Sequence, residues 1–157
     1  MQAARDDAVL VVELQGDSMQ PVLPRGCRLR VEPLDPGAPL RPGEIVVLRG
    51  ALGLVVHRLV WLSSAAGDQH LVHRGDAGGR LGVALKSALV GRVRAVLVPA
   101  LPLPTIEALG PEALLAFARA QRRARLFLIL AGLRRALGRV GLRLDGPAAW
   151  LRGQLLS

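Results

Sequence analysis

Tyrosine is absent from this sequence of 157 residues, which holds only two Phe, two Trp and one cysteine, Cys27. A single cysteine excludes an intramolecular disulfide and a zinc site built from thiolates. So few aromatic side chains leave little for stacking on nucleic-acid bases, and no nucleic-acid partner is expected. Cys27 is expected to be a half-buried structural residue, because most free cysteines behave as small apolar side chains.

Long apolar runs are also missing. The longest candidates are residues 126–133 and the proline-interrupted residues 95–106, well short of the roughly 18 apolar residues that span a bilayer. Residues 1–7 are acidic, whereas a secretory signal begins with positive charge. The sequence therefore predicts a soluble, cytoplasmic protein whose only membrane contact would be peripheral.

Lysine is nearly absent, since Lys86 is the only one among 21 basic residues. The net charge of +9 is uneven: residues 1–104 hold twelve basic and nine acidic side chains, and residues 105–157 hold nine and three. Two interpretations of the basic C-terminal third remain open. It binds an anionic membrane, or it packs on the rest of the protein or a second subunit with its arginines in solvent.

What the sequence does contain is 51% apolar residues and 18 glycines, which indicates one turn-rich folded core. Short strand-like runs are separated by Gly, Pro and Asp. They are residues 8–14, 28–31, 44–48, 54–61, 70–73 and 89–98. This pattern predicts a mainly β domain (α+β overall), a coiled antiparallel structure that is partly closed.

Three prolines in residues 99–104 end the strand-rich part, and a helix is expected to begin near Thr105 or Pro111. Leucines and other apolar residues then recur at the spacing of one helix face. They are Leu126, Ile129, Leu130, Leu133, Leu137, Val140 and Leu144. Glycines at 132, 138 and 141 weaken this helix, and residues 145–147 should end it. We therefore expect a β domain over residues 1–104 and a basic amphipathic helical tail over residues 105–157.

Three polar residues have the types that serine-based acyl transfer requires, which are a hydroxyl, a base and a group that orients the base. Ser18 follows the first strand-like run in a turn, where it can present its hydroxyl to a cleft. His57 lies in an apolar strand and is a competent base near its ordinary pKa of about 6.5. Asp76, in a Gly-Asp turn, would accept the second imidazole N–H.

Each of these residues also has an ordinary structural interpretation. Ser18 alone would be a turn serine, His57 a core histidine, and Asp76 a turn residue bonded to its own backbone. His70 and His73 lie near Asp76 in the sequence, but residues three apart on a strand point to opposite faces, so no metal site is expected. The backbone N–H of Ser18 is the natural first donor to an oxyanion.

The motif Gly-x-Ser-Met-x-Pro-x-Leu-x-x-Gly over residues 16–26 resembles the serine box of signal peptidases and LexA-like repressor peptidases. The segments around His57 and Asp76 resemble the second and third boxes of that family, in the same order. The pair His57-Arg58 is similar to the SipW-like branch, which uses histidine where other members use lysine. The similarity covers roughly residues 8–98.

The resemblance implies a serine endopeptidase that cuts a leader or signal segment from a protein or peptide precursor, with Ser18, His57 and Asp76 as its catalytic residues and with no cofactor. This chain departs from the family pattern in three ways. Cys27 stands where aspartate is common, residues 79–82 carry no second acid, and no N-terminal membrane anchor is evident. A catalytically inactive member that binds a membrane or a protein is the alternative. A self-cleaving repressor is not expected, because only seven residues precede the first strand-like run.

Overall fold

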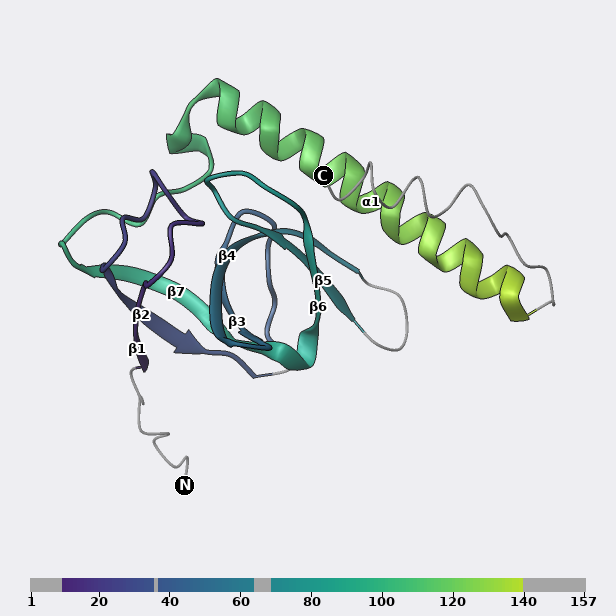
Figure 1. Cartoon of the computed structure of the whole chain (residues 1–157), viewed down its shortest axis with the longest axis horizontal. Coiled ribbons are helices and arrows are strands. Elements are labelled where there is room, and N and C mark those ends of the chain that lie inside the picture. Colours follow the sequence, from purple (N-terminus) through teal and green to yellow (C-terminus); the bar gives the residue numbers. More distant parts are fainter. Residues whose placement is uncertain (1–9, 36, 64–68, 140–157) are drawn as a thin grey trace.

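The computed structural model describes residues 10–35, 37–63 and 69–139, which form one seven-stranded sheet and a long C-terminal helix (Figure 1). The strands are β1 (Leu10–Glu13), β2 (Arg28–Pro33), β3 (Ile45–Gly50), β4 (Gly53–Leu62), β5 (His70–Arg74), β6 (Gly82–Leu85) and β7 (Leu89–Val98). The helices are the 3-10 turns η1 (Lys86–Ala88) and η2 (Glu107–Leu109) and the α-helix α1 (Pro111–Arg139).

All neighbouring strands are antiparallel, in the order β1-β2-β7-β3-β4-β5-β6. The sheet curls strongly, and α1 runs across one side of it (Figure 1). The prediction of a mainly β, antiparallel structure followed by a helix is therefore confirmed.

Each of the six strand-like runs corresponds to a strand, with ends that differ by a few residues. The sequence did not reveal β6, which lies at the edge of the sheet. Its side chains alternate between half-buried and exposed, and Val83 and Leu85 keep 40% and 44% of their surface in solvent. A four-residue edge strand that buries so little apolar surface leaves only a weak pattern in the sequence.

Strand β4 shows how the apolar residues divide between the two faces of the sheet, because successive side chains on a strand point to opposite sides. On one face, Val56 belongs to the core that includes Met19 and Leu23, and Val60 packs beneath α1. On the other face, Leu59 is fully buried in a separate apolar cluster with residues of β3 and β5.

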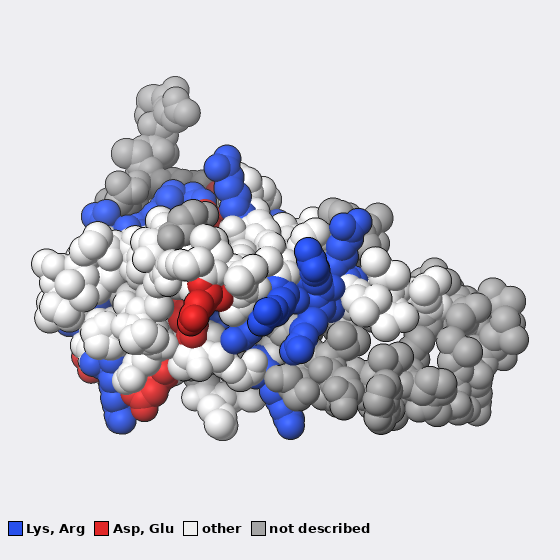
Figure 2. All heavy atoms as spheres, turned by 90° about the horizontal axis from the view of Figure 1, so that it is seen from above, with Lys and Arg blue, Asp and Glu red and all other residues white. Residues whose placement is uncertain are grey.

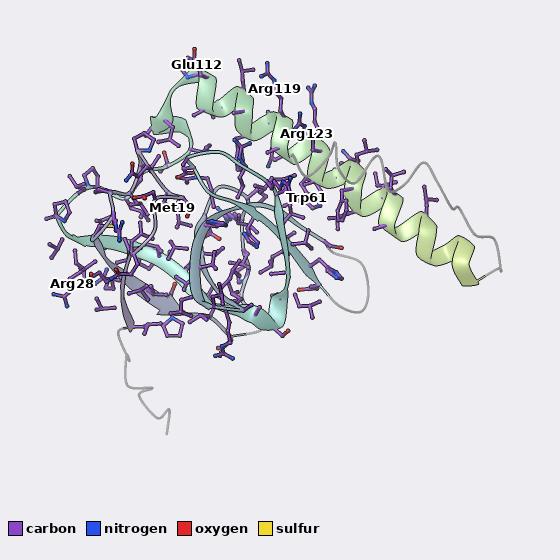
Figure 3. All side chains as sticks on the ribbon, in the orientation of Figure 1. Met19, Arg28, Trp61, Glu112, Arg119 and Arg123 are labelled. Carbon is purple, nitrogen blue, oxygen red and sulfur yellow. The ribbon has the colours of Figure 1, made fainter. Side chains whose placement is uncertain are left out.

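The helix α1 begins at Pro111, one of the two positions expected, and continues through Gly132 and Gly138 without a break. It contacts the sheet through Ala120 and Ala124, which are buried against Val60 and Val72. The side chain of Trp61 packs at the same contact, beneath α1 (Figure 3). The helix therefore packs on the sheet. This agrees with one of the two interpretations of the basic C-terminal third.

The leucine stripe expected from the sequence is not the face that packs on the sheet. Its members Leu126, Ile129 and Leu133 are 46%, 51% and 52% exposed. Small alanines take the inner positions instead, because they let the helix approach the strands closely. The expected break at residues 145–147 and the end of the stripe lie outside the described residues. No helix within the described ranges is both long and apolar enough to cross a membrane.

Candidate active site

Ser18 lies on the loop between β1 and β2, and its side chain is exposed. The base of the loop is closed by a backbone hydrogen bond of 2.9 Å from Leu14 N–H to the carbonyl of Cys27. Met19 and Leu23 are completely buried and attach the loop to the core, and Met19 is labelled in Figure 3. Buried neighbours thus hold the exposed hydroxyl in place.

His57 lies on β4, opposite Val46 of β3, and its Nε2 atom is 3.2 Å from the Ser18 Oγ. The two residues are 39 positions apart in the sequence, and the fold brings them within hydrogen-bonding distance. Burial lowers the pKa of His57 below its usual value of 6.5, and the nearby negative charge of Asp76 opposes part of this effect. At neutral pH the ring is therefore uncharged and has one nitrogen lone pair available.

The other ring nitrogen of His57 faces a second histidine. His57 Nδ1 lies 2.8 Å from the Nδ1 atom of His73 on β5, and the ring centres are 5.0 Å apart. Residue 82 on β6, which pairs with His73, is a glycine. A Cβ atom at Gly82 would overlap the His73 ring, so the missing side chain provides the space in which that ring lies.

The short distance between the two Nδ1 atoms couples their protons, since one must donate and the other accept. If His57 accepts a proton from Ser18 at Nε2, its own proton is on Nδ1 and His73 Nδ1 is the acceptor. His73 then carries its proton on Nε2. Burial and, second, the charge of His57 lower the pKa of His73 to about 4, so at neutral pH His73 is uncharged and can accept this bond.

Asp76 does not occupy the orienting position that the sequence suggested. Both of its carboxylate oxygens accept hydrogen bonds from Arg58, at 2.8 Å from Nε and 2.7 Å from NH2. Arg58 and Asp76 are 2% and 8% exposed. Because His57 and Arg58 are consecutive on β4, their side chains point to opposite faces, and the carboxylate is bound on the face away from the His57–His73 pair.

The turn that carries Asp76 nevertheless contacts the serine loop. Ala77 N–H donates to the carbonyl of Ser18 at 2.9 Å. A Cβ atom at Gly75 would overlap the same carbonyl, so the turn approaches Ser18 as closely as glycine permits. The Arg58–Asp76 ion pair therefore stabilises the turn on which the backbone of Ser18 rests.

Two further residues of the Ser18 loop, Cys27 and Asp17, have structural roles. Cys27 is 1% exposed, and burial raises the pKa of its thiol, so it is a structural residue and more buried than expected. Asp17 is a turn residue, whose side chain accepts a hydrogen bond of 2.8 Å from the Gln20 side chain. Over the part of the chain that the structure describes, no three His, Cys, Asp or Glu side chains are grouped as a metal site would require.

No known protein-family model matches the sequence, and no curated protein is significantly similar to it. The chemistry of the site therefore has to be inferred from its geometry and from the motifs themselves.

Proposed function

We propose that this protein is a serine endopeptidase of the signal peptidase-like class that cuts a leader or signal segment from a protein or peptide precursor. One observation carries the proposal: the exposed Ser18 hydroxyl lies 3.2 Å from Nε2 of His57, whose depressed pKa keeps it uncharged at neutral pH. A hydroxyl paired with a neutral imidazole is the minimal arrangement for nucleophilic acyl transfer.

In the acylation step, Ser18 Oγ attacks the scissile carbonyl carbon while its proton moves to His57 Nε2. The C–N bond then breaks, and the leaving amine takes that proton from Nε2. In the second step, water attacks the ester carbonyl and gives a proton to Nε2. Nε2 then returns it to Ser18 Oγ as the ester bond breaks, which restores the hydroxyl and releases the acid.

His73 takes the orienting role in this mechanism. By accepting the Nδ1 proton of His57, it fixes the tautomer that leaves Nε2 unprotonated, and it stabilises the imidazolium formed in each step. A neutral imidazole stabilises that cation less than a carboxylate does. The charge of Asp76, which favours protonated His57 at longer range, adds to this stabilisation.

The oxyanion and the substrate backbone have candidate partners too. Among the described residues, the Ser18 N–H donates to no backbone carbonyl, so it is available to a developing oxyanion. The edge strand β1 leads directly into the Ser18 loop. We propose that an extended substrate pairs with this edge, with its scissile bond beside Ser18.

A fluorophosphonate probe, which forms a covalent bond with activated serines, tests the proposal. We expect purified protein to be labelled at Ser18, as identified by peptide mass spectrometry, and Ser18→Ala to abolish the labelling. Ser87→Ala is the matched control, because Ser87 is exposed on η1, and it should be labelled like the wild type. Absence of labelling in the wild-type protein would contradict the proposal and favour an inactive binding module.

Replacing His73 tests its orienting role. We expect His73→Ala to slow probe labelling by about 10- to 100-fold, less than the roughly 10⁴-fold lost when a triad carboxylate is replaced. His73→Asp should restore much of the rate and raise the pKa of His57, because a carboxylate accepts the same proton and favours the imidazolium. The pH dependence of labelling measures this shift. An unchanged profile in both variants would assign His73 a purely structural role.

A further inference from the structure

The helix α1 has apolar side chains on two opposite sides. On the inner side, Phe117, Ala120, Ala124 and Leu128 pack toward β4 and β5. Leu115, Leu126, Ile129 and Leu133 project elsewhere and are 58%, 46%, 51% and 52% exposed. With a turn of about 3.6 residues, these four form one narrow stripe on the side opposite the sheet.

Arginines share this outer side of the helix. Arg119 and Arg122 fall between Leu115 and Leu126 along the stripe, and Arg123 and Arg125 flank it. All four are exposed, and Lys and Arg side chains gather over this part of the molecule (Figure 2). Arg119 and Arg123 point away from the sheet (Figure 3). Over the described ranges, none of the four forms a salt bridge.

From this juxtaposition we infer that the outer face of α1 docks on the surface of an anionic lipid bilayer. Burial of the exposed leucines at the boundary between head groups and acyl chains lowers the free energy of binding, and so does attraction between the neighbouring arginines and anionic head groups. A second copy of the chain fits less well, because Glu112 is the only acidic residue of α1 and two such faces would bring like charges together. This inference does not depend on the proposed peptidase activity.

The test is co-sedimentation of the full-length chain with large unilamellar vesicles. We expect binding to vesicles of phosphatidylglycerol and phosphatidylcholine, little binding to phosphatidylcholine alone, and weaker binding in high salt. The triple variant Arg119→Gln/Arg122→Gln/Arg123→Gln should lower the partition coefficient at least 10-fold. The double variant Leu126→Ser/Ile129→Ser should also lower it, which separates insertion of apolar side chains from charge attraction.

The matched control removes the same number of positive charges, three, from the β domain. Arg25, Arg30 and Arg49 are exposed, and their replacement by glutamine should leave vesicle binding within about twofold of the wild type. An equal loss in this control would overturn the inference in favour of general charge attraction. Unchanged binding in both α1 variants would overturn it as well. The inference would also be overturned if analytical ultracentrifugation showed a concentration-dependent dimer that the variant Leu126→Ser/Ile129→Ser no longer forms. Fluorophosphonate labelling of each variant reports on the Ser18 site independently.

Discussion

His57→Ala is expected to slow fluorophosphonate labelling of Ser18 by about 10³- to 10⁴-fold, because the hydroxyl loses the base that accepts its proton. The Nε2 atom of His57 lies 3.2 Å from Ser18 Oγ. Within the described residues, no other histidine nitrogen is hydrogen-bonded to Ser18. The measurement is the second-order rate constant for labelling, followed by intact-protein mass spectrometry.

His70→Ala is the matched control, because His70 lies on the neighbouring strand β5, where it pairs with Leu85 at the opposite end from His73. Its labelling rate should equal that of the wild type. In the wild type, the rate should fall as the pH drops through a pKa below 6.5, because protonation removes the lone pair of His57 and burial depresses that pKa. A midpoint above 6.5, or an equal rate in His57→Ala, would contradict the assignment of His57 as the base.

Ser18 and His57, which we propose as nucleophile and base, could be predicted as candidates from the sequence because each depends on a local pattern. A serine in a turn fixed by buried neighbours and a histidine in an apolar strand can each be recognised from adjacent residues. Their proximity required the strand pairing that the structure supplies, with β4 beside β5 and the Ser18 loop against the turn at Gly75.

The contact between His57 and His73, the proposed orienting residue, could not be predicted from the sequence because it depends on strand register. Leu59 pairs with His73, and this alignment places His57 and His73 diagonally on the same face of the sheet. The only local sign of this contact was Gly82, whose missing side chain leaves room for the His73 ring. Because β6 was not recognised as a strand, this glycine could not be interpreted from the sequence. Asp76 had the right chemistry, but Arg58 binds its carboxylate on the opposite face.

The packing face of α1 could not be predicted from the sequence either. The periodicity of its leucines correctly indicated a helix, but did not show which face would contact the sheet. Alanines at 120 and 124 take that position, and their small size carries little weight in a hydrophobic pattern although it permits the closest packing.

Arg58→Ala and Asp76→Ala are each expected to reduce the free energy of unfolding by about 3–5 kcal/mol, because either change leaves a buried charge without its partner. Arg58 also donates to the carbonyl of Gly43 at 2.7 Å, so its loss leaves that acceptor unpaired too. Both variants should label more slowly, since the turn at residues 75–77 supports Ser18. Urea denaturation and labelling rates measure the two effects.

The comparison between these variants decides what Asp76 does. If the Asp76 carboxylate acts mainly through Arg58, the two variants lose similar stability, and their labelling rates differ only by the smaller long-range effect of the Asp76 charge on His57. The double variant Arg58→Met/Asp76→Leu should then recover much of the stability, because paired apolar residues often replace a buried ion pair at little cost. Arg94→Ala serves as the control, since Arg94 is 45% exposed in its ion pair with Glu32 and its loss should cost at most about 1 kcal/mol. A large loss of labelling in Asp76→Ala alone, with stability intact, would show instead that this carboxylate acts directly on His57.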